Sequence, residues 1–412
     1  MDLKVNTSEI AGIVSAPISK SAAHRLIIAC ALAGVYKLPD VINDDIAATV
    51  RCLNVIFANE NTVGSDAPFA DANAGESGST LRFLLPIACA LGSKVRFWGE
   101  GRLGSRPIKQ LTDALNAHGA KITGDALPLN INGRLESGEY IIDASVSSQY
   151  ITGLLFALPL LDGDSRIVLD GSIVSGSYIN ITLDVLKKFG IKIEREKSGF
   201  YIKGSQRYKV PDGVANSDTL KVEGDWSSAG FLLAMGVLCG DVEVKNLDLD
   251  SAQGDKVIVE LLRRAGGRVE ISNGSVTAKK SLLKAIEFDA TDCPDIVPIM
   301  SVVLAAANGV SKISGVDRLK QKESDRLFAV RAMLSGFGID TQYESDTLYI
   351  CGGKLRGGEL YGFNDHRIAM SSIVGAMCAE GESIVRGVEC IKKSYPAFIH
   401  DAVALGGRCE RI

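Results

Sequence analysis

The sequence predicts an α/β protein of two domains, in which the helices are buried and the sheets lie outside. One pattern, a small polar cap before an apolar run of roughly a dozen residues that ends at glycine or asparagine-glycine, recurs six times. An amphipathic segment and strand-like runs follow each apolar run, so that a copy has the order βαβαββ. Apolar first helices belong inside a protein, whereas amphipathic second helices lie at its surface.

The six copies occur at intervals of roughly 60–80 residues. Their polar caps predict helix starts near Lys20-Ser21, Ser77-Gly78-Ser79, Ser147-Ser148-Gln149, Ser227-Ser228, Asp295 and Asp365-His366. The first helices that follow are apolar nearly all round: Leu26–Leu32, Phe83–Leu91, Ile151–Leu161, Phe231–Cys239, Val297–Ala307 and Ile368–Cys378. Because free backbone N–H groups attract anions, helix starts gathered in one place would form an anion-binding cleft.

The second segments close on glycine and a strand, most visibly in Ala114–Thr123, Leu183–Glu194, Val259–Ile271 and Arg331–Tyr343. In the second copy we expect a buried helix at Ser77–Gly92 and an amphipathic helix at Pro107–Gly119. Proline at position 107 suits the start of the second helix. The strands expected there are Lys94–Trp98 and Ala120–Ile122.

Six copies divide most simply into three and three. The fourth begins near Asp225, so one crossing between domains is expected near Lys221–Gly224. The strand Ile10–Ala16 precedes the first helix, and we assign it to the C-terminal domain, with a second crossing near Pro17–Ser19. The predicted domains are residues 19–223, and residues 1–18 together with 224–412.

Composition excludes several classes of protein. A chain of 412 residues with 46% apolar residues and 43 glycines indicates a compact α/β protein. The net charge of −4 argues against nucleic acid or a membrane surface as a partner. Nine cysteines without CxxC spacing indicate buried, reduced thiols in the cytoplasm. We see no secretory signal, no run long enough to span a bilayer, and no spacing of the four histidines that favours a metal site.

Basic residues recur at the predicted helix starts, where guanidinium forks and free N–H groups suit phosphate and carboxylate. They are Lys20, Arg25, Arg82, Arg106, Lys322, Arg326, Arg367 and Lys393. Surface salt bridges are the alternative for any single one, and Lys322 and Arg326 have the i, i+4 spacing of one helical face. Together they indicate one or two small polyanionic substrates.

Two carboxylates, Asp295 and Glu323, are candidates for base and acid. Asp295 could equally be a plain helix cap, and Glu323 an ordinary ion-pair partner. The serines and the amide of Ser147-Ser148-Gln149 suit a phosphate. The run Gly99–Gly104 matches GxGxxG, but a lone match is weak, and Arg102 and Arg106 favour an anion loop over a dinucleotide site. His366 is either a base or a capping group.

The chain resembles the 5-enolpyruvylshikimate-3-phosphate synthase family. The matching stretches span nearly the whole chain in the family's order: SKSAAHR (Ser19–Arg25), GESGSTLRF (Gly75–Phe83), SRPI (Ser105–Ile108), SSQY (Ser147–Tyr150), PD (Pro294-Asp295), KESDRL (Lys322–Leu327), NDHRIAM (Asn364–Met370) and KSYP (Lys393–Pro396).

The resemblance implies an inside-out α/β barrel fold and an enzyme of the shikimate pathway, which leads to chorismate and the aromatic amino acids. The reaction transfers enolpyruvyl from phosphoenolpyruvate to the 5-hydroxyl of shikimate 3-phosphate and releases phosphate, without metal or organic cofactor. It also implies a monomer in the cytoplasm, and the herbicide glyphosate as an inhibitor that occupies the phosphoenolpyruvate site.

The resemblance also assigns roles. Asp295 matches the base on the attacking hydroxyl, and Glu323 with Lys20 matches the groups that handle the methylene proton. The shikimate 3-phosphate positions are Lys20, Ser21, Arg25, Ser147, Ser148, Gln149, Ser175, Tyr178, Asp295 and Lys322. The phosphoenolpyruvate positions are Lys20, Gly78, Arg106, Gln149, Arg326, Arg367 and Lys393.

Three positions depart from the family pattern. Glu76 stands where the family usually has asparagine, beside the phosphoenolpyruvate pocket, and Arg318 and His24 stand where some members have asparagine.

Three alternatives remain. UDP-N-acetylglucosamine enolpyruvyl transferase shares the fold and the donor, but it uses a loop cysteine that Gly99–Ser105 lacks. RNA 3′-phosphate cyclase would need a basic RNA-binding face. A non-catalytic anion-binding scaffold would not need Lys20, Asp295 and Glu323, which are all present.

Overall fold

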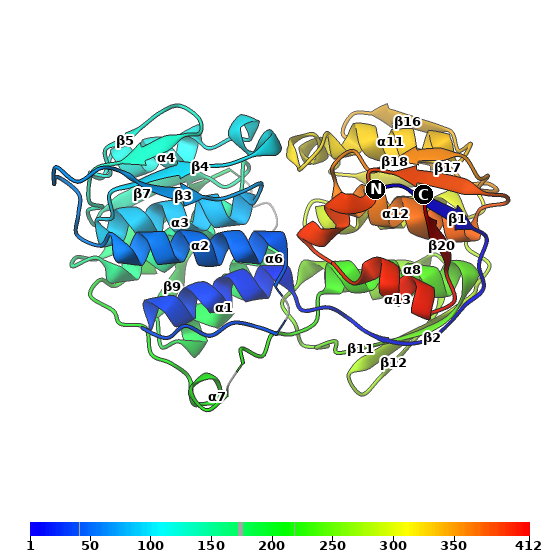
Figure 1. Ribbon diagram of the computed structural model, residues 1–412, viewed down its shortest axis with the longest axis horizontal. Coiled ribbons are helices and arrows are strands. Elements are labelled where there is room, and N and C mark those ends of the chain that lie inside the picture. The colour runs from blue at the N-terminus through cyan, green and yellow to red at the C-terminus, as the bar shows by residue number, and fades with distance from the viewer. Residues whose placement is uncertain (41, 172–175, 218) are drawn as a thin grey trace. The chain divides into compact units, whose positions relative to one another are not determined.

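The computed structural model describes residues 1–40, 42–171, 176–217 and 219–412. The chain forms two compact units (Figure 1). The N-terminal unit is Lys20–Val222, and the C-terminal unit is Met1–Ser19 together with Glu223–Ile412. Each boundary lies one residue from the one expected from the sequence.

The N-terminal unit contains two four-stranded sheets in its described residues, with strand orders β3-β4-β6-β5 and β7-β8-β10-β9. The strands are β3 (Ala70–Asn73), β4 (Val95–Trp98), β5 (Ile122–Thr123), β6 (Leu129–Ile131), β7 (Glu139–Asp143), β8 (Ser165–Asp170), β9 (Ile193–Glu196) and β10 (Gly199–Ile202). The helices are α1 (Lys20–Leu32), α2 (Asp44–Ala58), α3 (Gly78–Leu91), α4 (Lys109–Asn116), α5 (Ser148–Ala157), α6 (Gly176–Lys188) and α7 (Asp212–Ala215), with 3-10 turns η1 (Gly101–Ser105) and η2 (Leu158–Leu160).

The C-terminal unit contains three four-stranded sheets in its described residues, β12-β13-β11-β2, β14-β15-β17-β16 and β18-β19-β1-β20. The strands are β1 (Leu3–Asn6), β2 (Ile10–Ser15), β11 (Gly240–Lys245), β12 (Arg268–Ser272), β13 (Ser275–Lys279), β14 (Glu287–Asp289), β15 (Val310–Ser314), β16 (Thr341–Glu344), β17 (Thr347–Cys351), β18 (Glu359–Tyr361), β19 (Ser383–Arg386) and β20 (Arg408–Arg411). The helices are α8 (Trp226–Cys239), α9 (Ile258–Arg264), α10 (Val297–Ala305), α11 (Arg326–Gly336), α12 (His366–Cys378) and α13 (Phe398–Ala404), with 3-10 turns η3 (Gly254–Val257), η4 (Pro294–Ile296), η5 (Asp317–Gln321) and η6 (Val388–Lys393).

One topology is common to these sheets. Each sheet has one parallel pair of strands and two antiparallel pairs, as in β14 with β15, then β15 with β17 and β17 with β16. A helix joins the parallel pair in four of the sheets, whereas the N-terminal unit and α8 lie between β2 and β11. This is the predicted βαβαββ repeat. The first copy differs, because its described residues supply helices α1 and α2 but no sheet. Strand β2 pairs in parallel with β11 of the fourth copy, as expected from its place before the first helix.

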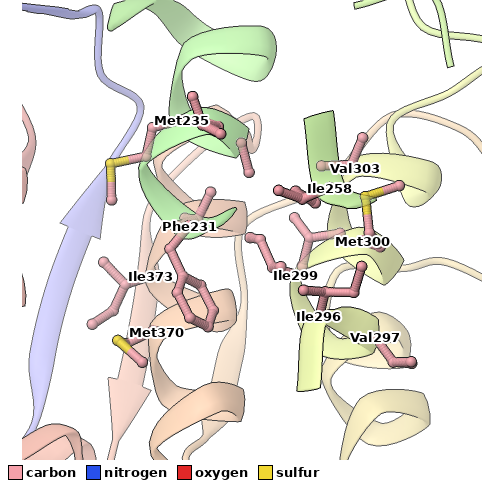
Figure 2. Close-up of a cluster of buried hydrophobic side chains, with 14 of the residues drawn as sticks. Phe231, Met235, Ile258, Ile296, Val297, Ile299, Met300, Val303, Met370 and Ile373 are labelled. Carbon is pink, nitrogen blue, oxygen red and sulfur yellow. The ribbon is translucent and has the colours of Figure 1, made fainter. Parts of the chain in front are cut away.

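The first helix of each copy is buried. Every residue of α10 is buried, and so are all but one in α8 and in α12. In the C-terminal unit α8, α10 and α12 pack against one another, and Figure 2 shows Phe231, Met235, Met300, Met370 and Ile373 among the side chains of this core. Strands such as β4 alternate buried and exposed side chains, so their sheet covers the helices with one face and meets solvent with the other. The predicted helix Pro107–Gly119 begins only at Lys109.

The two crossings pair with each other at the edge of the C-terminal unit. The N–H of Ser19 donates to the carbonyl of Glu223 at 2.7 Å, and the N–H of Asp225 donates to the carbonyl of Pro17 at 2.7 Å. A Cβ on Gly224 would lie 1.9 Å from the carbonyl oxygen of Asn246, so this crossing requires glycine.

Candidate active site

The carboxylate of Asp295 is surrounded by cations of the C-terminal unit. Its Oδ1 accepts hydrogen bonds from Nη1 of Arg326 at 2.8 Å and Nζ of Lys322 at 3.3 Å, and its Oδ2 accepts from Nη2 of Arg367 at 3.0 Å. Asp295 lies in η4, one residue before Ile296, which occupies the N-cap position of α10. The helix-cap interpretation is therefore wrong.

Arg326 joins three carboxylates. It contacts Asp295, Glu323 at 2.6 Å and Asp365 at 2.9 Å, and only 1% of its side chain is exposed. Burial opposes the charged form of Arg326, but the three carboxylates outweigh it and raise its pKa. Burial would also raise the pKa of Asp365, yet Arg326 holds that pKa below its usual value. Arg326 and Asp365 are therefore both charged, and their ion pair holds the two side chains in place.

Lys322 and Arg326 do not share a helix face, contrary to the spacing argument. Lys322 follows η5 with an extended backbone, and α11 begins only at Arg326, after its N-cap Asp325. The two side chains nevertheless meet at Asp295. Burial lowers the pKa of Lys322, and the nearby Asp295 opposes that shift.

Lys393 is positioned by a strained segment. Its Nζ donates to the carbonyl oxygen of Asn364 at 3.0 Å and to Oδ1 of the same residue at 2.9 Å. Phe363 and Asn364 have φ angles of 52° and 54°, a region that is unfavourable for a bulky residue. Asp365, which follows, caps α12 by accepting from the N–H of Arg367 at 3.0 Å. One short segment thus orients both Lys393 and the start of the Arg367 helix.

In the N-terminal unit, Arg25 is a buried cation. It donates to Oγ1 of Thr182 at 2.8 Å and to the carbonyl oxygens of Ser21 at 2.7 Å and Tyr178 at 3.1 Å. Only 2% of Arg25 is exposed, and within the described residues no carboxylate lies at salt-bridge distance. Burial lowers the pKa of its guanidinium. A buried cation held by neutral oxygens is suited to an anionic ligand.

Lys20, the first residue of α1, forms an ion pair of 2.8 Å with Asp45 of α2. Both side chains are 15% exposed, so the pair is partly shielded from water while its ammonium remains accessible. Asp45 could not be singled out from the sequence, because acidic residues are common in the first turn of a helix.

Gly78 opens α3 beside two guanidinium groups. A Cβ at this position would lie 2.7 Å from Nη1 of Arg106 and 2.7 Å from Nη1 of Arg82. Nε of Arg106 is buried and has no hydrogen-bond partner among the described residues. Arg82 donates to Oε1 of Gln149 at 2.8 Å, and Nε2 of Gln149 donates to Oγ of Ser79 at 3.0 Å. Cationic groups and two helix starts therefore converge, an arrangement that suits an anion.

The remaining predicted residues lie near these groups or outside the described part of the chain. Ser147 caps α5 by accepting from the N–H of Gln149 at 3.3 Å, and Ser148 is the first residue of that helix. Tyr178 contributes its carbonyl oxygen to Arg25. Ser175 lies outside the described residues.

The three departures from the family pattern have definite surroundings. The carboxylate of Glu76 lies against Gly101, where a Cβ would be 2.6 Å from Oε2. Arg318 donates to the carbonyl of Thr291 at 2.9 Å. Nδ1 of His24 lies 2.7 Å from Oγ1 of Thr49, whose hydroxyl lies 2.7 Å from that of Thr80 in α3. His24 thus connects α1, which carries Lys20, with the helix that Gly78 opens.

Among the described residues, no group of three or more histidine, cysteine, aspartate or glutamate side chains could hold a metal ion. No described helix has the length and apolar character needed to cross a bilayer. All nine cysteines are free thiols, and most are buried as expected, but Cys351 is exposed.

Comparison with known proteins places nearly the whole chain in one family. Residues 5–401 match the family model for EPSP synthase (3-phosphoshikimate 1-carboxyvinyltransferase). Curated proteins named 3-phosphoshikimate 1-carboxyvinyltransferase from Clostridium novyi and Clostridium acetobutylicum are 37% and 39% identical to this chain; both alignments cover 98% of it, and 98% and 97% of those proteins.

Solved structures show the same fold. EPSP synthase from Acinetobacter baumannii matches with a TM-score of 0.78 at 22% identity over the whole of both chains. The enolpyruvyl transferase NikO from Streptomyces tendae matches with a TM-score of 0.75 at 18% identity, covering 99% of this chain and 98% of that one. With a family match over nearly all its length and relatives of this identity, the chain belongs to the EPSP synthase family.

Proposed function

We propose that this chain is a 3-phosphoshikimate 1-carboxyvinyltransferase. It transfers the enolpyruvyl group of phosphoenolpyruvate to the 5-hydroxyl of shikimate 3-phosphate and releases phosphate. The observation that carries the proposal is the carboxylate of Asp295 held among Lys322, Arg326 and Arg367. This arrangement supplies a base beside cations that suit the carboxylate and phosphate of a donor.

The reaction needs an acid and a base at opposite ends of the new bond. Protonation of the methylene carbon of phosphoenolpyruvate gives the neighbouring carbon cationic character. The 5-hydroxyl oxygen then attacks that carbon, and Asp295 accepts the hydroxyl proton. The tetrahedral adduct contains a methyl group, the new C–O bond and the original C–O–phosphate bond.

Elimination reverses only the protonation of the methylene carbon, and the hydroxyl proton taken up by Asp295 passes to the leaving phosphate or to solvent. A methyl proton is removed, the C–O bond to phosphate breaks, and the enolpyruvyl double bond forms again. We assign the methylene proton to Glu323 and Lys20. Arg326 holds Glu323 at 2.6 Å, and the pair of Lys20 with Asp45 favours the charged ammonium. Fixed cations stabilise the anionic groups of the adduct throughout, and because they are already in place they need no reorganisation.

The substrate contacts follow from the two sets of residues. We assign shikimate 3-phosphate to Lys20, Ser21, Arg25, Ser147, Ser148, Gln149, Ser175, Tyr178, Asp295 and Lys322. We assign phosphoenolpyruvate to Lys20, Gly78, Arg106, Gln149, Arg326, Arg367 and Lys393. The buried Arg25, which has oxygen partners but no carboxylate at salt-bridge distance within the described residues, supports the first assignment. We also propose that the protein acts as a monomer in the cytoplasm, and light scattering of the purified protein tests the oligomeric state.

A comparison of acceptors tests the proposed function. The full chain is incubated with phosphoenolpyruvate and either shikimate 3-phosphate, UDP-N-acetylglucosamine or no acceptor, and free phosphate is measured. We expect phosphate release only with shikimate 3-phosphate, in equal amount to the acceptor consumed. Release with UDP-N-acetylglucosamine would support the wall-synthesis alternative, and binding of both substrates without release would support a non-catalytic scaffold.

A further inference from the structure

Asp255 is a buried carboxylic acid to which the proposed reaction gives no role. It lies in η3 of the C-terminal unit, and only 3% of the residue is exposed. The hydroxyl of Ser227, in the first turn of α8, donates to its Oδ2. Its Oδ1 is buried and has no hydrogen-bond partner among the described residues. A buried carboxyl group with one unpaired oxygen is costly to ionise, so the neutral form is favoured.

The loop that carries Asp255 is hydrogen-bonded to the start of α8. Oε1 of Gln253 accepts from the N–H of Trp226 at 3.0 Å, and its Nε2 donates to the carbonyl of Gly224 at 2.9 Å. The N–H of Gln253 also donates to Oγ of Ser251 at 3.1 Å. Because both ends of the Gln253 side chain are bonded, the neighbouring carboxyl is held in the interior.

The polar and charged groups around Asp255 belong to three other elements of the C-terminal unit. Asp225 and Ser227 belong to the start of α8, Cys293 and Asp295 precede α10, and Arg367 lies in α12. On its own element, Lys256 donates to the carbonyl of Leu249 at 2.8 Å. The pKa of Asp255 is raised to about 7, mainly by burial and to a smaller extent by the charge of Asp295. Arg367 and the Ser227 hydroxyl oppose this shift.

The charge of Asp255 bears on the cations around Asp295. Arg367 pairs with Asp295 at 3.0 Å, and Arg367 favours the ionised form of Asp255 whereas Asp295 opposes it. An ionised Asp255 would therefore place a further negative charge near Arg367 that competes with an anionic donor, inside a buried region where water screens poorly.

We propose that Asp255 is a positioning residue for the phosphoenolpyruvate side of the site, which holds a proton while the enzyme works and whose ionisation weakens the interaction of Arg367 with the donor. The proposal rests on the proposed function and extends it. We therefore expect the affinity for phosphoenolpyruvate to fall above neutral pH as the carboxyl group of Asp255 ionises.

The test is the pH profile of kcat/KM for phosphoenolpyruvate, measured from about pH 5.5 to 9 with saturating shikimate 3-phosphate. The wild-type protein should lose roughly tenfold in kcat/KM across one ionisation near neutrality, mainly through KM. Asp255→Asn, which keeps the shape but cannot ionise, should lack that step. Asp250→Asn, an exposed residue of the same loop, is the matched control and should keep the wild-type profile.

Ser227→Ala provides an independent variant. Its hydroxyl stabilises the ionised carboxyl, so removing it should move the alkaline step to higher pH. Superimposable profiles for the wild type and Asp255→Asn would overturn the proposal; if Asp255→Asn does not fold, an unmoved step in Ser227→Ala would do so. A wild-type protein that releases no phosphate with shikimate 3-phosphate at any pH would instead refute the proposed function itself.

Discussion

Nη1 of Arg326 lies 2.8 Å from Oδ1 of Asp295, although 31 positions separate the two residues in the chain. The guanidinium is buried and is shared with Glu323 and Asp365, so it is fixed before any ligand arrives. The same cation therefore holds the proposed base and the proposed acid in place. Preorganisation of this kind is what allows charged groups to favour a transition state.

Lys20→Met should abolish phosphate release and leave the fold intact. Methionine keeps most of the aliphatic length but cannot carry the proton or pair with Asp45. The measurement is turnover with both substrates, together with circular dichroism. Lys109→Met, at an exposed lysine paired with Asp113, should behave as the wild type. Near-wild-type turnover in folded Lys20→Met protein would remove Lys20 from the mechanism.

Asp295→Asn and Glu323→Gln should each reduce kcat by about 100-fold or more, as expected for loss of a positioned acid or base. Both amides preserve shape, so calorimetric binding of the substrates should change little. Glu260→Gln, at an exposed helix position beside Arg264, is the control. If binding is lost while turnover at saturation is unchanged, these residues are ligands and not catalysts.

Gly78→Ala should raise the KM for phosphoenolpyruvate by about tenfold or more, because the new methyl group would displace the guanidinium groups of Arg82 and Arg106. Inhibition by glyphosate should weaken with it. Gly104→Ala is the matched control, since a Cβ there meets no atom within 4 Å. Equal KM and equal inhibition in the two variants would mean that the donor does not approach Gly78.

His24 should make the fold sensitive to acid. Burial lowers its pKa from 6.5 to about 3. As the pH falls below 6.5, the unfolded chain takes up a proton here that the folded chain refuses, so stability falls by about 1.4 kcal/mol per pH unit until the folded pKa is reached. His24→Asn should therefore lose less thermal stability than the wild type between about pH 6 and pH 4.

The exposed His400 offers a control for this prediction, and His400→Asn should keep the wild-type dependence on pH. An equal loss of melting temperature in His24→Asn and wild-type protein would show that another group causes the acid sensitivity.

The repeats were predictable because they depend on local signals. Polar caps at Ser77 and Ser147 and long apolar runs located the buried helices, and the crossing near Asp225 followed from counting copies. Local signals misled where a short turn preceded a helix. Asp295 has the sequence context of a cap, but the 3-10 turn that contains it turns its carboxylate toward Arg326.

Pairings between residues in distant segments could not be predicted from the sequence. Nothing local marks Asp45 as the partner of Lys20, or Asp365 as one of the three carboxylates that Arg326 contacts. The same holds for Asp255, whose distinctive property is a buried Oδ1 atom with no hydrogen-bond partner among the described residues. Residue types predicted the chemistry of the site, and only the fold determined which charges neutralise one another.

The proposed reaction is an addition–elimination in which the methylene carbon of phosphoenolpyruvate gains and then loses a proton. The most direct test is turnover of the full chain with shikimate 3-phosphate and phosphoenolpyruvate in D₂O, followed by mass spectrometry of the product. We expect an enolpyruvyl product with deuterium in its methylene group and one phosphate released for each product formed. A product without deuterium would contradict this mechanism, because the methylene carbon would then never have been protonated.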